Sequence, residues 1–330
     1  MHNLGLITTR SQILKILEPN KVQSGEGLAK KLKISRQALH KQIQILRKAG
    51  YLIEGKSNLG YQLLSKPDIL IPEEIKNSLM TDFVGRDFFY FKGLDSTQNK
   101  VKELANQGSK EGTLVLAEKQ SSGRGRLGRT WISESGGLWF SVLLRPRIPP
   151  QQVPLLSLIA SLAIAKGIEA STSISCALKW PNDILIETEP QQYKKLCGIL
   201  VEMASESDRV NWVVIGCGVN VNNEIPSSLV DKATSLKSAS GTFINRTLLL
   251  SSILTELENN YEKFLREGFV PFRKEYLDRF ILLGKKVLLT NFEQDIEGEC
   301  VTIDPEGHLI LLTRDQKTEK FSAGEVSLSI

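Results

Sequence analysis

An alternation of glycine and arginine between residues 123 and 129 constrains this chain more than any other feature. The segment 120–131 reads Gln-Ser-Ser-Gly-Arg-Gly-Arg-Leu-Gly-Arg-Thr-Trp and lies between strand-like runs at 113–117 and 138–144. Glycine lets the main chain approach a ligand closely, and successive exposed N–H groups form a concavity that binds anions. Arginine adds planar cations that match phosphate and carboxylate groups. The segment therefore predicts a loop that holds a phosphate-bearing ligand.

The spacing of the loop excludes two common phosphate-binding motifs. No Gly-Lys-Ser/Thr closes it, as a Walker A loop requires, and the G-x-G-x-x-G spacing of a dinucleotide-binding turn is absent. A disordered arginine–glycine segment that binds RNA is the alternative that its composition alone leaves open. The strand-like runs on both sides favour a folded loop.

The first 66 residues differ in charge from the rest of the chain. They contain 12 Lys and Arg residues against 3 Asp and Glu residues, a local net charge of +9, so the remainder carries −4 of the total of +5. A small basic segment attached to a mildly acidic body indicates that the small segment binds a polyanion.

Three helices and a hairpin are expected in this basic segment. Apolar residues at helical spacing indicate a first helix, which Pro19-Asn20 ends. Ser24 and Ser35 have suitable side chains for the N-caps of a second and a third helix. The runs 51–54 and 61–64, joined by a polar turn that includes Gly55, predict a β-hairpin.

The third helix carries polar side chains of the kinds that reach base edges and phosphates in a major groove. They are Arg36, Gln37, His40, Lys41, Gln44 and Arg47. We therefore expect residues 1–66 to form a winged helix-turn-helix domain that binds DNA, with a linker at 65–68. A winged helix used for dimerisation or protein contacts is the alternative, and the local charge favours DNA.

The remainder of the chain favours an α+β fold in two parts. Apolar helices are expected at 153–169 and 246–268, and hairpin-like strands flank the loop, so a mixed α/β catalytic domain at 67–280 is preferred over a parallel α/β sheet. From 281 to 330 short strands split by turns predict a small β-barrel. Its strands are expected at 287–289, 297–301, 309–312 and 320–322.

Composition excludes several classes of protein. No run of about twenty apolar residues is present, so no membrane span is expected. The amino terminus lacks a charged region followed by an apolar signal core. The four cysteines stand singly, which argues against a zinc ribbon or a disulfide framework and suits a reducing cytoplasm. Cys197 and Cys217 lie in apolar runs and are expected to be buried rather than nucleophilic.

Three further motifs follow the loop. They are Lys-Trp-Pro-Asn-Asp at 179–183, Lys-Leu-Cys-Gly-Ile-Leu-Val-Glu at 195–202 and Gly-Cys-Gly-Val-Asn at 216–220, and Asp95-Ser96-Thr97 precedes the loop. Together with the loop, and in this order, these motifs closely resemble those of biotin protein ligases. The resemblance covers the whole chain, from the helix-turn-helix start to the last strands. It therefore points to the bifunctional bacterial form, in which biotin ligase and biotin-operon repressor are one polypeptide.

The resemblance implies a fold, a reaction and partners. The central domain would resemble class II synthetases, and the terminal barrel would be SH3-like. The implied activity is that of a biotin–[acetyl-CoA-carboxylase] ligase: biotin and ATP give biotinyl-5′-AMP, and a lysine of the biotin carboxyl carrier protein then takes the biotin. Biotin, ATP and Mg²⁺ are the implied ligands. Operator DNA upstream of biotin genes is a second implied partner, and a homodimer is expected when the adenylate is bound.

The resemblance also implies roles for individual residues. Lys195, Asp183 and Arg126 would be catalytic, with Lys195 on the biotin carboxylate and the α-phosphate, and Asp183 helping to hold Mg²⁺. The implied biotin-binding residues are Ser96, Thr97, Gln98, Gln120, Gly123, Arg124, Gly125, Arg126 and Lys195. The implied nucleotide-binding residues are Arg124, Arg126, Arg129, Trp131, Lys179, Asn182 and Asn220. For Trp131, simple core packing is the alternative to an apolar wall.

Two positions depart from the pattern of the family. Thr97 is followed by Gln98 and then Asn99, where many relatives have Asn directly after Thr. The final residues 325–330 contain no basic side chain, although relatives can carry an arginine there that contacts the nucleotide. We therefore expect no nucleotide contact from the last strand.

Three other functions compete with the bifunctional one. The chain could be a ligase whose DNA-binding domain does not regulate, a ligand-sensing regulator with an inactive enzyme core, or a lipoate ligase of related fold. The intact Lys-Trp-Pro-Asn-Asp motif and Lys195 argue against an inactive core, and the Gly-Arg-Gly-Arg loop argues against a lipoate ligase. The sequence does not separate a regulatory from a non-regulatory winged helix.

Overall fold

The structure of the chain is a computed structural model, and its described residues are 9–17, 21–48, 50–56, 59–65, 68–290 and 295–328. The chain forms two compact units, Met1–Asn77 and Ser78–Ile330. The linker expected at 65–68 falls partly on Lys66 and Pro67, and the end of the first helix falls on Pro19-Asn20. These four residues lie outside the described residues. The domain limits at 66 and 280 remain predictions.

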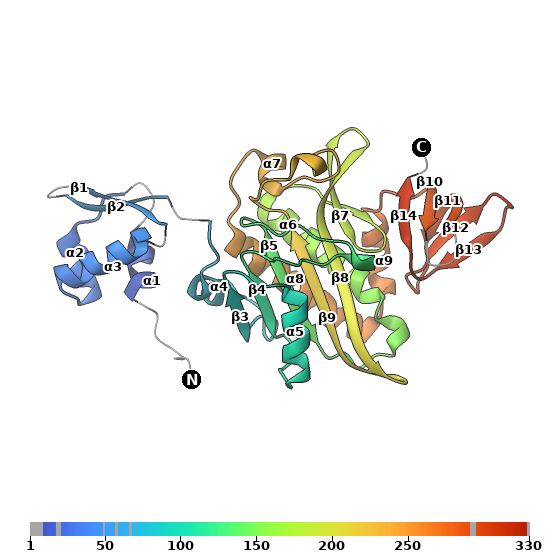
Figure 1. Ribbon diagram of the computed structural model, residues 1–330, viewed down its shortest axis with the longest axis horizontal. Helices are drawn as coiled ribbons and strands as arrows, with labels where there is room; N and C mark the ends of the chain where they lie inside the picture. The colour runs from blue at the N-terminus through green and yellow to red at the C-terminus, as the bar shows by residue number, and fades with distance from the viewer. Residues whose placement is uncertain are drawn as a thin grey trace. The chain divides into compact units, whose positions relative to one another are not determined.

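Within its described residues, the first unit has the three helices and the hairpin that the sequence predicts, followed by a helix, α4, that it did not predict (Figure 1). The elements are α1 (Thr9–Ile16), α2 (Gly25–Leu32), α3 (Arg36–Lys48), β1 (Leu52–Lys56), β2 (Gly60–Ser65) and α4 (Pro72–Ser78). Ser24 Oγ accepts the main-chain N–H of Gly27 at 3.4 Å, and Ser35 Oγ accepts that of Ala38 at 3.1 Å, as expected of N-caps. Gly55 lies in β1 and pairs with Tyr61, so its expected place in the turn was wrong.

One face each of α1, α2 and α3 packs into a common core. Ile13, Leu28, Leu39 and Ile43 are fully or almost fully buried, and Leu63 of β2 joins them. The i, i+4 spacing of Leu39 and Ile43 places both on one side of α3. The opposite side of α3 is thereby left for solvent or a partner.

The second unit is built on a mixed sheet, and the α+β class is confirmed. Among the described residues this sheet has seven strands in the order β3-β4-β5-β9-β8-β7-β6, with only β3 and β4 parallel. The strands are β3 (Phe88–Phe91), β4 (Leu114–Ala117), β5 (Leu138–Leu144), β6 (Ala177–Lys179), β7 (Asp183–Glu189), β8 (Gln192–Glu206) and β9 (Arg209–Val219). The glycine–arginine loop connects β4 to β5, which pair antiparallel, as the flanking runs predict.

Helices cover the sheet on both faces. Figure 1 shows α5 in front of the sheet, and α6 and α8 behind it. The helices of this unit are α5 (Thr97–Asn106), α6 (Leu155–Thr172), α7 (Leu236–Ser240), α8 (Arg246–Glu267) and α9 (Val270–Leu277). α5 packs on β4, β5 and β9, while α6 packs on α8 and on β8. This packing explains why α6 is apolar. The helical stretch Pro150–Thr172 is long and apolar enough to span a membrane, but 67% of its apolar part is buried inside the protein.

A five-stranded antiparallel sheet ends the described residues, in the order β13-β12-β11-β10-β14. Its strands are β10 (Lys286–Thr290), β11 (Asp295–Ile303), β12 (Leu309–Thr313), β13 (Thr318–Phe321) and β14 (Glu325–Leu328). Val287, Leu289, Leu311 and Val326 form its buried interior. The four expected strand stretches coincide with or overlap β10 to β13. The turn Asp304–His308, between β11 and β12, and the residues around β14 are the parts of this sheet that matter for the site.

Candidate functional site

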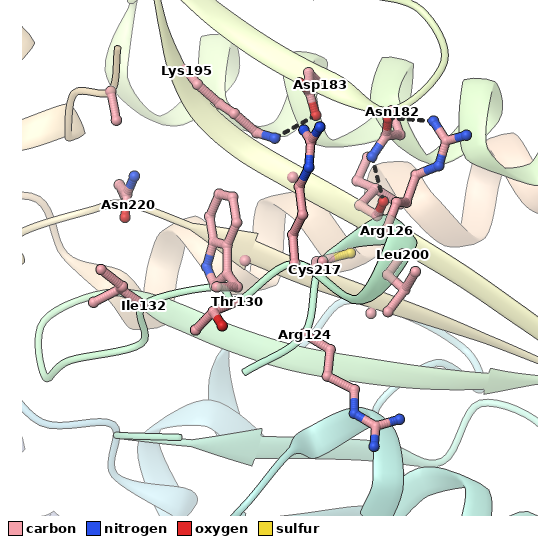
Figure 2. Close-up of a pocket in the computed structure, with 18 of the residues that line it drawn as sticks. Arg124, Arg126, Thr130, Ile132, Asn182, Asp183, Lys195, Leu200, Cys217 and Asn220 are labelled. Carbon is pink, nitrogen blue, oxygen red and sulfur yellow. Dashed lines mark hydrogen bonds and ion pairs between the residues drawn. The ribbon is translucent and has the colours of Figure 1, made fainter. Parts of the chain in front are cut away.

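A cavity of about 500 Å³ lies over the sheet of the second unit (Figure 2). Its walls come from the start of α5, the glycine–arginine loop, the segment 179–183, the facing parts of β8 and β9, the segment 223–233 and the start of β14. The motifs singled out in the sequence therefore meet around one space, although they are far apart along the chain.

One end of the cavity is neutral and polar. Thr97 at the start of α5 donates its main-chain N–H to Gln120 Oε1 at 2.8 Å, and its hydroxyl lies 2.9 Å from Ser141 Oγ. Gln120 Nε2 in turn donates to Ser133 Oγ at 2.8 Å. Ser96 and Thr97 are buried. A network of buried hydroxyls and amides suits a neutral polar ligand group.

Gln98 belongs to the same network but is held mainly by the sheet. Its Oε1 accepts Ser141 Oγ at 3.1 Å, and its Nε2 donates to the Val214 carbonyl at 3.3 Å. A Cβ on Gly216 would lie 2.2 Å from Gln98 Oε1, so only glycine leaves room for this side chain. The amide therefore fixes the start of α5 against β9.

Two more glycines of the sheet leave room for Trp131. A Cβ on Gly218 would lie 2.3 Å from Trp131 Nε1, and one on Gly198 would lie 2.9 Å from the Trp131 ring. The indole therefore lies flat on β8 and β9 and lines the cavity. Its N–H is buried against Gly218 and has no hydrogen-bond partner among the described residues.

The glycine–arginine loop is folded, not disordered. Arg124 and Thr130 form a bridge across it, and Gly125 donates its N–H to the Arg129 carbonyl at 2.7 Å. Gly123 lies outside the cavity wall, because it is buried where a Cβ would meet the Trp131 carbonyl at 2.3 Å. Because Gly123 lacks a side chain, the two ends of the loop can pack closely together there. Gly123 does not line the cavity.

Three arginines of the loop have different surroundings. Arg126 donates from Nη1 to Asn182 Oδ1 and from Nη2 to the Gly324 carbonyl, both at 3.1 Å. Burial lowers the pKa of Arg126, an effect that Asp183 and Glu325 oppose. Arg129 forms a two-pronged ion pair with Glu325 of β14. Arg124 is exposed, and Figure 2 shows its side chain directed away from Arg126 and Lys195.

The charged end of the cavity centres on Lys195 and Asp183. Lys195 Nζ lies 2.7 Å from Asp183 Oδ1 and 5.2 Å from the centroid of the Trp131 ring. The contact to Asp183 has the distance of an ion pair but not the angles of a hydrogen bond, so Oδ1 is buried without a hydrogen-bond partner among the described residues. Lys179 lies nearby, where burial lowers its pKa and Asp183 opposes this shift.

Most of the residues expected in the site do line this cavity. They are Ser96, Thr97, Gln98, Gln120, Arg124, Gly125, Arg126, Arg129, Trp131, Lys179, Asn182, Asp183, Lys195 and Asn220. Cys197 and Cys217 are buried, and burial raises the pKa of both thiols, as expected of cysteines that are not nucleophiles.

Sequence reasoning missed two parts of the wall. The segment 223–233 runs alongside β8, because the N–H of Lys195 donates to the Lys232 carbonyl at 2.8 Å and Thr234 donates to the Lys195 carbonyl at 3.0 Å. The start of β14 contributes Glu325 and Val326. No local sequence pattern indicates that either part lines the cavity. The role of Glu325 follows only from its ion pair with Arg129, which is distant in the sequence.

The polar residues of α3 lie on its surface but are not equivalent. Arg36, Gln37 and Lys41 are exposed. His40 Nδ1 lies 3.2 Å from the Tyr61 hydroxyl, and Gln44 Nε2 lies 3.3 Å from His40 Nε2. Arg47 donates from Nε to the Ile53 carbonyl at 2.8 Å, so it ties the helix to the hairpin as well as contributing charge.

Comparisons with known proteins agree with this architecture. Residues 90–220 match the biotin/lipoate A/B protein ligase family, residues 9–62 match an HTH domain, and residues 282–329 match the biotin protein ligase C terminal domain.

Whole-chain relatives extend the match over both units. The chain is 39% identical over 322 residues to the bifunctional ligase/repressor BirA of Bacillus subtilis, covering 96% of this chain and 98% of that protein. It is 30% identical to the protein of the same name from Escherichia coli, covering 97% of each. The structure of a biotin protein ligase from Aquifex aeolicus in complex with biotin and ATP superposes with a TM-score of 0.64 at 33% identity, covering 74% of this chain and 99% of that one. The chain belongs to the family of bifunctional biotin ligase/repressor proteins.

Proposed function

We propose that this chain makes biotinyl-5′-AMP from biotin and ATP, transfers the biotin to a lysine of a biotin carboxyl carrier protein, and represses biotin genes when it holds the adenylate. One observation carries the enzymatic half: a neutral polar pocket at Thr97 and Gln120 and a charged group at Lys195, Asp183 and Arg126 line the same cavity. Biotin has a neutral ureido ring at one end and a carboxylate at the other.

The neutral end suits the ureido ring. Its two N–H groups and one carbonyl need acceptors and a donor, and the hydroxyls of Ser96 and Thr97 and the amide of Gln120 offer both kinds of group. Thr97 and Gln120 are preorganised by their mutual hydrogen bonds, so little ordering of these two side chains is needed when the ring binds. Trp131 would form the apolar wall beside it.

The charged end suits the reacting groups. A carboxylate and a triphosphate repel each other, and the first step requires their oxygen and phosphorus atoms to meet. Lys195 Nζ would lie between these anions, and Arg126 would neutralise phosphate charge from the loop. A biotin carboxylate oxygen then forms a bond to the α-phosphorus, and the bond to the bridging oxygen breaks, so pyrophosphate leaves with the electron pair.

The second step transfers the acyl group. The neutral amine of a carrier lysine attacks the carbonyl carbon of the mixed anhydride, its nitrogen loses a proton, and AMP leaves with the electrons of the broken C–O bond. No covalent enzyme intermediate is needed. The enzyme contributes positioning and charge, which accords with the absence of an exposed cysteine among the described residues.

Mg²⁺ fits this end of the cavity. Asp183 Oδ1 is buried and accepts no hydrogen bond among the described residues, and a hard cation prefers such a carboxylate oxygen together with phosphate oxygens. The ion would neutralise the triphosphate. Asp183 would hold it, and Lys179 and Lys195 would meet the remaining negative charge.

The enzymatic proposal is tested by biotin-dependent exchange of labelled pyrophosphate into ATP. Exchange is expected with biotin and not with lipoate, because the neutral pocket is built around amide and hydroxyl groups. Exchange that proceeds equally with lipoate, or none with either acid, would refute it.

The regulatory proposal rests on the winged helix and on the number of half-sites. One chain presents one α3, whereas tight operator binding by such motifs usually takes two half-sites read by a two-fold dimer. If the adenylate favours the dimer, dimerisation must tighten adenylate binding by the same factor. Sedimentation and binding to DNA from upstream of biotin genes, each with and without biotin plus ATP, test this half. If neither the oligomeric state nor the affinity for DNA changes with biotin and ATP, the regulatory proposal is refuted, whereas the ligase proposal is unaffected.

The protein would work in the cytoplasm. Its four free cysteines suit a reducing compartment, and its proposed substrates, ATP and the carrier protein, and its proposed partner, operator DNA, are all found there. Fractionation of cells with an antibody to the chain would test this.

A further inference from the structure

A tight turn of the carboxy-terminal sheet contacts the Lys-Trp-Pro-Asn-Asp segment. Trp180 donates its indole N–H to the Gly307 carbonyl at 3.2 Å, between residues that are 127 positions apart. Trp180 is 2% exposed, so this donor has no solvent to replace the carbonyl. On the other side of the segment, Ser157 Oγ of α6 donates to the Pro181 carbonyl at 3.0 Å.

Gly307 reaches Trp180 because it lacks a side chain. A Cβ there would lie 2.3 Å from Leu155 Cδ2 and 3.0 Å from Leu158 Cδ1, both on α6. Its φ of 81° is also one that residues with a side chain rarely adopt. The turn thus sits directly on α6 and faces the tryptophan.

A buried carboxylate builds the turn. Asp304 accepts the N–H of Glu306 at 3.0 Å and that of His308 at 2.8 Å through Oδ1. Its Oδ2 accepts His308 Nδ1 at 3.0 Å and Lys320 Nζ at 3.1 Å. These four contacts fix the direction of the Gly307 carbonyl. A metal site here is not favoured, since Asp304 already has both oxygens in use.

We propose that the Asp304–His308 turn is a positioning element for the active site, which acts through Trp180 on Asn182 and Asp183. The inference rests on the proposed ligase function. Asn182 Oδ1 accepts Arg126, and Asp183 pairs with Lys195, so a shift of this segment moves both partners of the charged end. Among the described residues, no hydrogen bond joins the turn to the neutral end at Thr97 and Gln120, so this end should not respond.

The test is a double-mutant cycle in the full-length chain. Asp304→Ala removes the carboxylate that orders the turn and thereby the fixed direction of the Gly307 carbonyl, and Trp180→Phe removes the indole donor. Each is expected to lower kcat of biotin-dependent pyrophosphate exchange about tenfold and to leave KM for biotin within about twofold. The double variant should be no slower than the slower single variant, because both act through one interaction. Glu297→Gln is the control: this exposed carboxylate of β11, in the same sheet, pairs only with Arg314 among the described residues, and exchange should be unchanged.

Multiplicative effects in the double variant, or a normal kcat in Asp304→Ala, would overturn the proposal. If thermal unfolding shows that Asp304→Ala does not fold, His308→Ala is used in its place. This variant removes one hydrogen-bond donor to Asp304 and keeps the carboxylate. A measurement that does not depend on catalysis tests the positioning role separately from the proposed ligase function. The indole N–H of Trp180, one of four tryptophans, should exchange with solvent at least about tenfold faster in the turn variants than in the wild type and in Glu297→Gln. Unchanged exchange would refute the positioning role, whereas a wild-type chain without biotin-dependent activity would refute the function alone.

Discussion

Lys195→Met separates the contribution of Lys195 to catalysis from its contribution to stability. Methionine keeps most of the apolar stem and removes the charge. In the structure this leaves Asp183 Oδ1, already without a hydrogen bond among the described residues, without its cation at 2.7 Å. The perturbation therefore removes a group proposed to meet developing negative charge, and it also leaves a carboxylate uncompensated.

The effect on stability is small, because the pair is only partly buried. The side chains of Lys195 and Asp183 are 33% and 19% exposed. At that exposure we expect a loss of roughly 1 kcal/mol, near the upper end for exposed pairs and well below the value for buried ones. In a folded unit of this size that corresponds to a fall in Tm of about 2–4 °C. Asp183→Asn in the same chain should recover most of it.

The effect on catalysis is large. Loss of one group that stabilises transition-state charge costs about 10²–10³-fold in rate, or about 2.7–4 kcal/mol. We therefore expect biotin-dependent pyrophosphate exchange to fall by at least about a hundredfold in Lys195→Met, with no recovery on adding Asp183→Asn. Lys194→Met is the matched control, because Lys194 Nζ donates to the Val230 carbonyl and does not line the cavity. Exchange within about tenfold of wild type in Lys195→Met would refute the assigned role.

Three further results are expected. Arg126→Ala removes the bonds to Asn182 and Gly324, so labelled adenylate should dissociate faster and biotinylate lysines of a bystander protein; unchanged dissociation and bystander labelling would count against a retaining loop. Arg36→Ala combined with Lys41→Ala should reduce the slope of log affinity for DNA against log salt by about two, and an unchanged slope would remove α3 from the phosphate contacts. Burial alone would raise the pKa of Asp304, but hydrogen bonds from His308 and Lys320 lower it to about 2. Asp304 therefore stabilises the fold above its ordinary pKa of 3.8, and this contribution is lost as the pH falls toward 2. Acid unfolding of Asp304→Asn should be flatter in that window, and an identical pH profile would contradict this.

Local sequence signals predicted the elements that local chemistry determines. Ser24 and Ser35 cap α2 and α3 because an N-cap needs only one side chain and the next turn of helix. The loop at 123–129 was predicted to lie between strands, and it does connect β4 to β5. The gathering of the motifs around one cavity was expected from the family resemblance, since spacing alone does not bring Lys195 to Asp183.

Contacts between distant segments were beyond the sequence. Glu325 meets Arg129 across 196 positions, and Gly307 meets Trp180 across 127. The residue type of neither Glu325, at the start of a strand, nor Gly307, in a turn, indicates which distant segment the residue touches. The expectation that the last strand makes no nucleotide contact stays a prediction. The sequence did not show that β14 lines the cavity with a carboxylate that pairs with an arginine of the loop.

The central claim is that this chain attaches biotin to a carrier protein through an adenylate. The most direct measurement is mass spectrometry of a purified biotin carboxyl carrier domain after incubation with the full-length chain, ATP and either biotin or lipoate. The account predicts that one lysine of the carrier gains one biotinyl group, only when biotin and ATP are both present. A carrier that stays unmodified under these conditions, or one modified equally well with lipoate, would contradict it.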